Sequence, residues 1–133
     1  MKEKLLTMLQ LQDGMNKKVH PDWIAQNYEW YRAAWIECAE LLDHQGYKWW
    51  KKQTPDTEQV ILEIVDIWHF GLSAMFELNT SVEQIAEEIA EQVSTFSQQE
   101  MSIHIATEQL AEGCLTQKRV PVHAFWQLMA SAG

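Results

Sequence analysis

The segment spanning residues 57–79 is apolar around almost the whole circumference of a helix. It reads TEQVILEIVDIWHFGLSAMFELN, and the polar side chains after its first turn are Gln59, Glu63, Asp66, His69 and Ser73. Spacings of four, three, three and four residues place these side chains on one face of an α-helix. A solvated helix face is normally wide and contains lysines, whereas this stripe is narrow and carries no cation. The segment therefore predicts a helix whose carboxylates face other parts of the protein.

A second expected helix repeats this pattern, since Glu37, Glu40 and His44 share one face among apolar side chains. Two helices thus each offer a pair of carboxylates at i and i+3, Glu37 with Glu40 and Glu63 with Asp66. Four carboxylates that face one another in a bundle cannot all stay ionised without compensation, which a divalent cation provides. Ligands that are all oxygen atoms favour Mg²⁺, with Mn²⁺ as the other option, over zinc.

Two other interpretations compete with a magnesium site. One pair of glutamates at i and i+3 usually marks a solvated face, as we expect at Glu88 with Glu91 and, at a spacing of four, at Glu83 with Glu87. A di-iron centre normally takes Glu-x-x-His from two helices. This chain offers only Asp66-x-x-His69, and position 40 is Glu rather than His. Two carboxylate pairs, each within an apolar helix, favour the Mg²⁺ site over both alternatives.

The rest of the chain also follows the helical period. Only five Gly and three Pro interrupt the 133 residues, which predicts an all-α helical bundle of about five to six helices forming a single domain over residues 1–133. The expected helices span about 2–15, 29–45, 57–79, 82–96, 98–112 and 121–129. Gly46 and Gly113 are expected C-terminal stops, and Asp56 or Thr57 and Ser81 are expected N-caps.

Charge and composition limit the partners. The net charge of −9 argues against broad contact with nucleic-acid phosphates or an anionic membrane surface. The first residues contain no continuous hydrophobic run, so we expect no signal peptide or membrane span. Cys38 and Cys114 lie in no C-x-x-C spacing, which favours a reducing, cytoplasmic location. Seven Trp and the apolar third helix exceed what a small monomer easily buries, so we expect a homodimer.

Three stretches of the chain resemble the dimeric dUTPase family, within the all-α NTP pyrophosphatase (MazG-like) superfamily. They are LQLQDGMN at 9–16, ECAELLDHQGYKWWK at 37–51 and EIVDIWHF at 63–70. The combination is specific because both carboxylate pairs, the KWWK segment and the His after the Asp recur in order. The resemblance covers roughly the first 80 residues, and residues 81–133 match only weakly, as helical scaffold.

This resemblance implies hydrolysis of dUTP, and also of dUDP, to dUMP by water attack assisted by Mg²⁺. Its metal ligands fall on Glu37, Glu40, Glu63 and Asp66, and one of the first two is the expected general base. Its nucleobase contacts fall on Gln12 and Asn16, with Trp49 and His69 as possible walls of the base pocket.

Lys48 and Lys51 are the nearest cations for phosphate oxygens. Simpler interpretations of these binding residues stay open. Gln12 and Asn16 also fit a helix end, Trp49 fits a packed aromatic, and residues 47–52 fit a solvent-facing segment.

The resemblance also implies a further segment after a helix like VHAFWQLMASAG, with phosphate-binding Asn, Lys and Arg residues and a Gly-Tyr motif. The sequence stops at Gly133, so we expect a truncated product or a short variant that obtains those groups elsewhere. Two functions follow as hypotheses. The first is a Mg²⁺-dependent dUTP pyrophosphohydrolase, and the second is a non-catalytic helical dimerisation or nucleotide-binding module.

Overall fold

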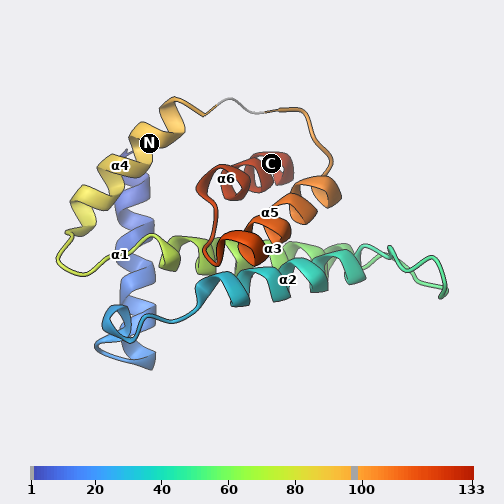
Figure 1. The fold of residues 1–133 in the computed structure, drawn as a ribbon, viewed down its shortest axis with the longest axis horizontal. Coiled ribbons are helices and arrows are strands. Elements are labelled where there is room, and N and C mark those ends of the chain that lie inside the picture. Colours follow the sequence, from blue (N-terminus) through green and yellow to red (C-terminus); the bar gives the residue numbers. More distant parts are fainter. Residues whose placement is uncertain (1, 97–98) are drawn as a thin grey trace.

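The computed structural model describes residues 2–96 and 99–133 of the chain. Over those ranges the fold is helical and contains no strand (Figure 1). The elements are α1 (Lys2–Val19), the 3-10 helix η1 (Trp23–Gln26), α2 (Trp30–His44), α3 (Thr57–Ala74), α4 (Val82–Ser94), α5 (Ile103–Gln117) and α6 (Val122–Ala132). The predicted all-α class is confirmed.

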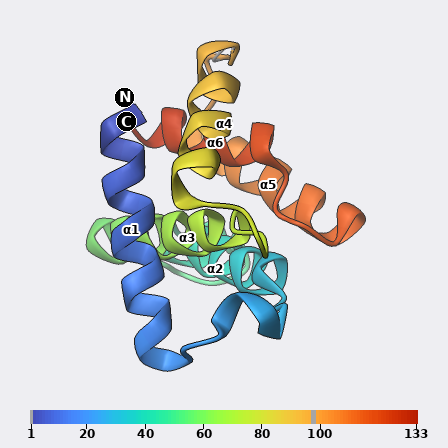
Figure 2. The same cartoon turned by 90° about the vertical axis from the view of Figure 1, so that its left-hand side faces the viewer.

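The centre of the fold is the pair formed by α2 and α3, which run antiparallel along each other (Figure 1). On one side of this pair α5 packs on α2, and α6 contacts both α5 and α3. At the end of α3 furthest from the α2–α3 loop, α1 crosses it, and α4 packs alongside α1 (Figure 2). In this arrangement the polar stripe of α3 meets α2 at Glu63 and meets α1 at His69 and Ser73.

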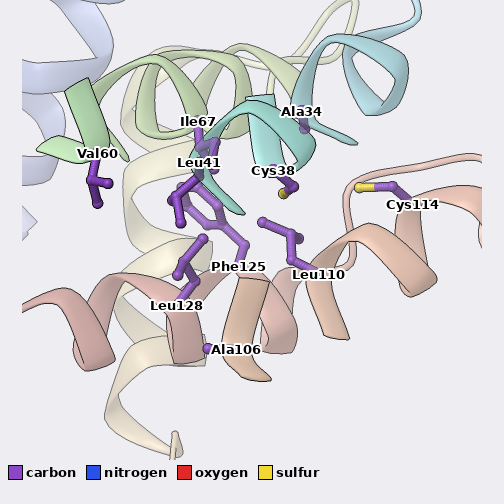
Figure 3. Close-up of a cluster of buried hydrophobic side chains, with 10 residues drawn as sticks. All are labelled: Ala34, Cys38, Leu41, Val60, Ile67, Ala106, Leu110, Cys114, Phe125 and Leu128. Atoms are coloured by element: carbon purple, nitrogen blue, oxygen red, sulfur yellow. The ribbon is translucent and has the colours of Figure 1, made fainter. Parts of the chain in front are cut away.

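Two hydrophobic clusters hold these layers together. The first lies between α2, α3, α5 and α6 and is built around Phe125 and Leu41, both fully buried (Figure 3). The second lies between α1, η1, α3 and α4 and includes Leu9 and Trp23. Trp68 packs against both clusters and stacks on Phe125 with ring centroids 5.8 Å apart. The side of α3 next to its carboxylates, which carries Val60, Ile67 and Trp68, is therefore part of the core.

Several predicted helix ends are confirmed by local hydrogen bonds and backbone angles. The side chain of Asp56 accepts a hydrogen bond from the Gln59 amide at the start of α3. Ser81 does the same for the Gln84 amide at the start of α4. Gly46 follows α2 with φ of +83°, a conformation that glycine adopts without strain.

Other predicted ends are wrong. Gly113 does not stop α5, which continues to Gln117 and is followed by Lys118 with a φ of 54°. A Cβ at Gly113 would lie 2.5 Å from Pro121 Cγ, so this glycine allows close packing instead of a turn. The expected start of this helix at Gln98 lies outside the described residues. The first helix is longer than predicted, and α3 is shorter.

Candidate functional site

The antiparallel pairing of α2 and α3 gathers three of the predicted metal ligands. One carboxylate oxygen from each of Glu37, Glu40 and Glu63 lies within 4.8 Å of the other two. Glu63 is buried, Glu37 is half-buried and Glu40 is exposed, so the cluster reaches from the helix interface to solvent. The polar stripes predicted on the two helices therefore face each other here, and their carboxylates meet in one cluster.

Asp66, the fourth predicted ligand, lies about one turn beyond Glu63 on α3 and is exposed. It does not belong to the group of three with close ligand atoms. Its charge nevertheless acts on Glu37 and contributes to raising the pKa of that carboxyl. Asp66 is therefore placed next to the cluster, on its solvent side.

The cluster is electrostatically strained in the absence of a cation. Burial raises the pKa of Glu37 to about 7, and repulsion from Glu40 and Asp66 adds to the effect. Burial also raises the pKa of Glu63, although His44 opposes this shift. One oxygen of each, Glu37 Oε2 and Glu63 Oε2, is buried and has no hydrogen-bond partner. Unpartnered, acceptor-only oxygens with excess negative charge fit a hard divalent cation.

His44 is a site residue to which the sequence assigned no role. Its Nδ1 atom lies 3.7 Å from Glu63 Oε2 and is buried without a hydrogen-bond partner. The signal was present, because His44 lies four residues after Glu40 on the same face of α2. When protonated, His44 supplies a positive charge beside the carboxylate cluster.

Where α1 crosses α3, four polar side chains form a closed hydrogen-bonded ring. His69 Nδ1 is 2.6 Å from Gln12 Oε1, and Gln12 Nε2 donates to Asn16 Oδ1 at 3.0 Å. Asn16 Nδ2 donates to Ser73 Oγ at 2.9 Å, and Ser73 Oγ donates to the His69 carbonyl at 2.8 Å. Three predicted base-contacting residues, Gln12, Asn16 and His69, are therefore brought together, and Ser73 is a member that the sequence did not single out.

The direction of this ring determines the state of His69. Because the Gln12 amide nitrogen donates to Asn16, its oxygen faces His69 and accepts the Nδ1 proton. In a neutral imidazole this leaves Nε2 as a hydrogen-bond acceptor. The ring therefore presents a defined tautomer at one end of the α3 stripe, with the carboxylate cluster further along the same stripe.

The remaining predicted substrate contacts lie elsewhere. The α2–α3 loop is at the opposite end of the helix pair from α1 (Figure 1). Within it, Trp49 is 89% exposed and packs edge-on against Trp50. Lys48 Nζ forms an ion pair with Asp43 Oδ1 at 2.9 Å, and Lys51 is exposed. In a single chain the structure therefore does not bring these three predicted contacts to the Gln12–His69 ring.

The acidic pairs assigned to solvent are exposed on α4, namely Glu83, Glu87, Glu88 and Glu91. They are separate from the α2–α3 cluster, as the sequence pattern predicted. Among the described residues, no helix combines the length and the apolar character that a membrane crossing requires.

Comparison with known proteins identifies the family. A family model described as dUTPase matches residues 4–133, which extends the resemblance from the first 80 residues through α4, α5 and α6. Searches of curated proteins and of solved structures gave no significant match. The family match covers the carboxylate cluster and the Gln12–His69 ring, and the helical fold agrees with it. The chain therefore belongs to the dUTPase family, in its all-α form.

Proposed function

We propose that this protein is a Mg²⁺-dependent nucleotide pyrophosphohydrolase that converts dUTP, and also dUDP, to dUMP. The observation that carries the proposal is the convergence of Glu37, Glu40 and Glu63 within 4.8 Å, with two buried oxygens unpartnered, in a chain of the dUTPase family. An isolated carboxylate cluster of this kind has no structural benefit, because mutual repulsion destabilises it.

Glu37, Glu40 and Glu63 would hold the metal, and Asp66 is positioned to join them from the next turn of α3. A bound Mg²⁺, or Mn²⁺ in its place, neutralises the carboxylates and makes the site attractive to phosphate oxygens. Carboxylates of α2 would also take the proton from the attacking water. Glu37 and Glu40 are the two candidates for that role.

The arrangement along α3 gives a direction to the substrate. Glu63 and His69 are separated by about 9 Å along the helix axis. We place the phosphates beside the carboxylates and the nucleobase beside the Gln12–His69 ring. His69 Nε2, an acceptor in the neutral imidazole, would then meet a donor group of the base. The contributions predicted for Lys48, Trp49 and Lys51 stay predictions.

We further propose that the chain forms a homodimer. Large apolar side chains are exposed on both α1 and α3, including Leu11 at 64%, Ile61 at 55% and Leu62 at 52%. Large exposed apolar side chains on two helices mark a surface that a partner covers. A symmetric contact between two copies of this surface would bury them. Sedimentation showing a monomer at micromolar concentration would contradict this proposal.

A cytoplasmic location is proposed with it. Cys38 and Cys114 both point into the first hydrophobic cluster as free thiols (Figure 3). Burial raises the pKa of Cys114 to about 11 and shifts the pKa of Cys38 in the same direction. Free, buried thiols suit a reducing compartment.

A non-catalytic nucleotide-binding module is the second candidate. The ion pair between Lys48 and Asp43 favours it, because it engages one of the two lysines expected to bind phosphate oxygens. Such a module would bind dUTP but would not hydrolyse it.

Pyrophosphate release from dUTP separates the two functions. With Mg²⁺ present, the wild-type protein should release pyrophosphate, Glu63→Gln should lose the activity, and Glu87→Gln, which alters an exposed carboxylate on α4, should keep it. Binding of dUTP measured by calorimetry without any turnover would select the second function. Comparison with dCTP under the same conditions would define the base preference.

A further inference from the structure

A separate cavity of about 400 Å³ lies between η1, the start of α2, the end of α3, α4 and the α5–α6 connection. None of the clustered carboxylates and no member of the Gln12–His69 ring lines it. Its volume falls in the range of cavities that bind small molecules. The proposed hydrolysis makes no use of this cavity, so its lining has to be explained independently.

Aromatic rings form one wall of the cavity. Trp23 contacts Trp30 and Phe76 edge-on, with centroids 5.8 and 5.0 Å apart. Tyr28 extends this wall, 5.7 Å from Trp30, and is 43% exposed. The edge-on packing fixes the rings, and Tyr28 is the ring of this wall that stays exposed to a planar ligand. Proteins commonly bind nucleobases by stacking them on such aromatic rings, whichever base is present.

Two adjacent cations, Lys118 and Arg119, line the same cavity and are exposed. In the parts of the chain that the structure describes, neither forms an ion pair, although Arg119 Nε donates to Gln117 Oε1 at 3.1 Å. Lys118 has a φ of 54°, a position after a helix where glycine is favoured. Besides Arg32 and Tyr31, Lys118 also lowers the pKa of Glu29, so its ammonium group lies near the start of α2, beside the cavity.

Two carboxylates, Glu77 at the end of α3 and Glu88 on α4, also line the cavity. Within the described ranges both are exposed, and no ion pair involves either of them. Carboxylates accept hydrogen bonds from the exocyclic amino group of a base such as cytosine. The cavity is thus lined by two carboxylates and two cations that form no ion pair with one another. Such a lining fits a ligand that has hydrogen-bond donors at one end and a negative charge at the other.

We propose that this cavity is a second nucleotide site that binds a nucleoside monophosphate with an amino-bearing base. The base stacks on the exposed ring of Tyr28, and its amino group donates to Glu77 or Glu88. The phosphate is bound by Lys118 and Arg119, whose charges match it. This site does not require the carboxylate cluster, so it stands independently of the proposed hydrolysis.

Binding of dCMP in the presence of EDTA, measured by calorimetry, tests the assignment. Arg119→Ala and Lys118→Gly should each weaken dCMP binding about tenfold, because each removes a charged contact to phosphate. The matched control is Lys52→Ala, since Lys52 is an exposed cation of the α2–α3 loop that does not line the cavity. Lys118→Gly should also unfold at a temperature no lower than the wild type, because glycine adopts the required φ without strain.

Two further comparisons identify the site and the base. Glu63→Gln should leave dCMP affinity unchanged, and dUMP, which has a carbonyl in place of the amino group, should bind more weakly than dCMP. Absence of dCMP binding at millimolar concentration would overturn the proposal. It would equally be overturned by loss of binding in Glu63→Gln, by unchanged affinity in both cavity variants, or by equal affinity for dCMP and dUMP.

Discussion

Replacing Glu37 with glutamine should stabilise the metal-free protein and, in the same step, remove its response to magnesium. In the folded chain the pKa of Glu37 is raised from 4.5 to about 7, chiefly by burial and then by Glu40 and Asp66. A carboxyl group with a raised pKa is harder to ionise in the folded than in the unfolded state. Its ionisation therefore lowers stability as pH rises from 4.5 through about 7, and the loss is constant above that pH.

The size of this effect follows from the pKa displacement. Each pKa unit corresponds to about 1.4 kcal/mol, which gives an upper limit of about 3 kcal/mol at neutral to alkaline pH. Because Glu37 is half-buried and partly screened by solvent, we expect roughly 1–2 kcal/mol. Glutamine has a similar shape and no charge, so Glu37→Gln should recover this amount. Below about pH 4.5, where the carboxyl is protonated in both states, the gain should vanish.

Urea unfolding in EDTA at a series of pH values between about 4.5 and 8 measures this difference. The control is Glu87→Gln, an exposed carboxylate of α4, which should leave stability within about 0.5 kcal/mol of the wild type throughout. With Mg²⁺ present the order should reverse, because only the wild type gains stability from the metal. A Glu37→Gln protein that is no more stable than the wild type at about pH 8 would refute the electrostatic account of the cluster.

Three other predictions concern packing, the hydrogen-bonded ring and the metal. Gly71→Ala should lower the free energy of unfolding in urea by about 1–3 kcal/mol, because its Cβ would overlap the Phe125 ring. Gly14→Ala, with no atom within 4 Å of the new Cβ, should raise that free energy by up to about 1 kcal/mol. Ser73→Ala should raise KM for dUTP more than it lowers kcat, since it opens the ring without touching the carboxylates; an unchanged KM would contradict the placement of the base. At 100 times its Kd, Mg²⁺ should stabilise the wild type by about 2.7 kcal/mol in thermal unfolding and should leave the stability of Glu63→Gln unchanged. Equal stabilisation of both proteins would argue against the cluster as the metal site.

The sequence predicted those features that depend on neighbours along the chain. Asp56 and Ser81 cap helices because their side chains reach amides three residues away. The carboxylate pairs of α2 and α3 were identified because i and i+3 positions share a helix face whatever the fold. The prediction failed at Gly113, where a local rule suggested a helix end. Its actual role depends on Pro121, which reaches it only after the chain has turned into α6.

The sequence by itself thus determined the helical class, the two carboxylate stripes and the residue types of the site, because helical periodicity is a local property of the chain. Only the tertiary structure decided which of those residues meet. The pairing of α2 with α3 brings Glu63 to Glu37, and the crossing of α1 over α3 joins Gln12 to His69. It also places the α2–α3 loop, which contains Trp49, at the opposite end of the helix pair from α1, and it assembles the second cavity from five segments of the chain. Such contacts follow from how helices pack against one another. The spacing of residues along one helix does not indicate which surface of another helix will face that helix.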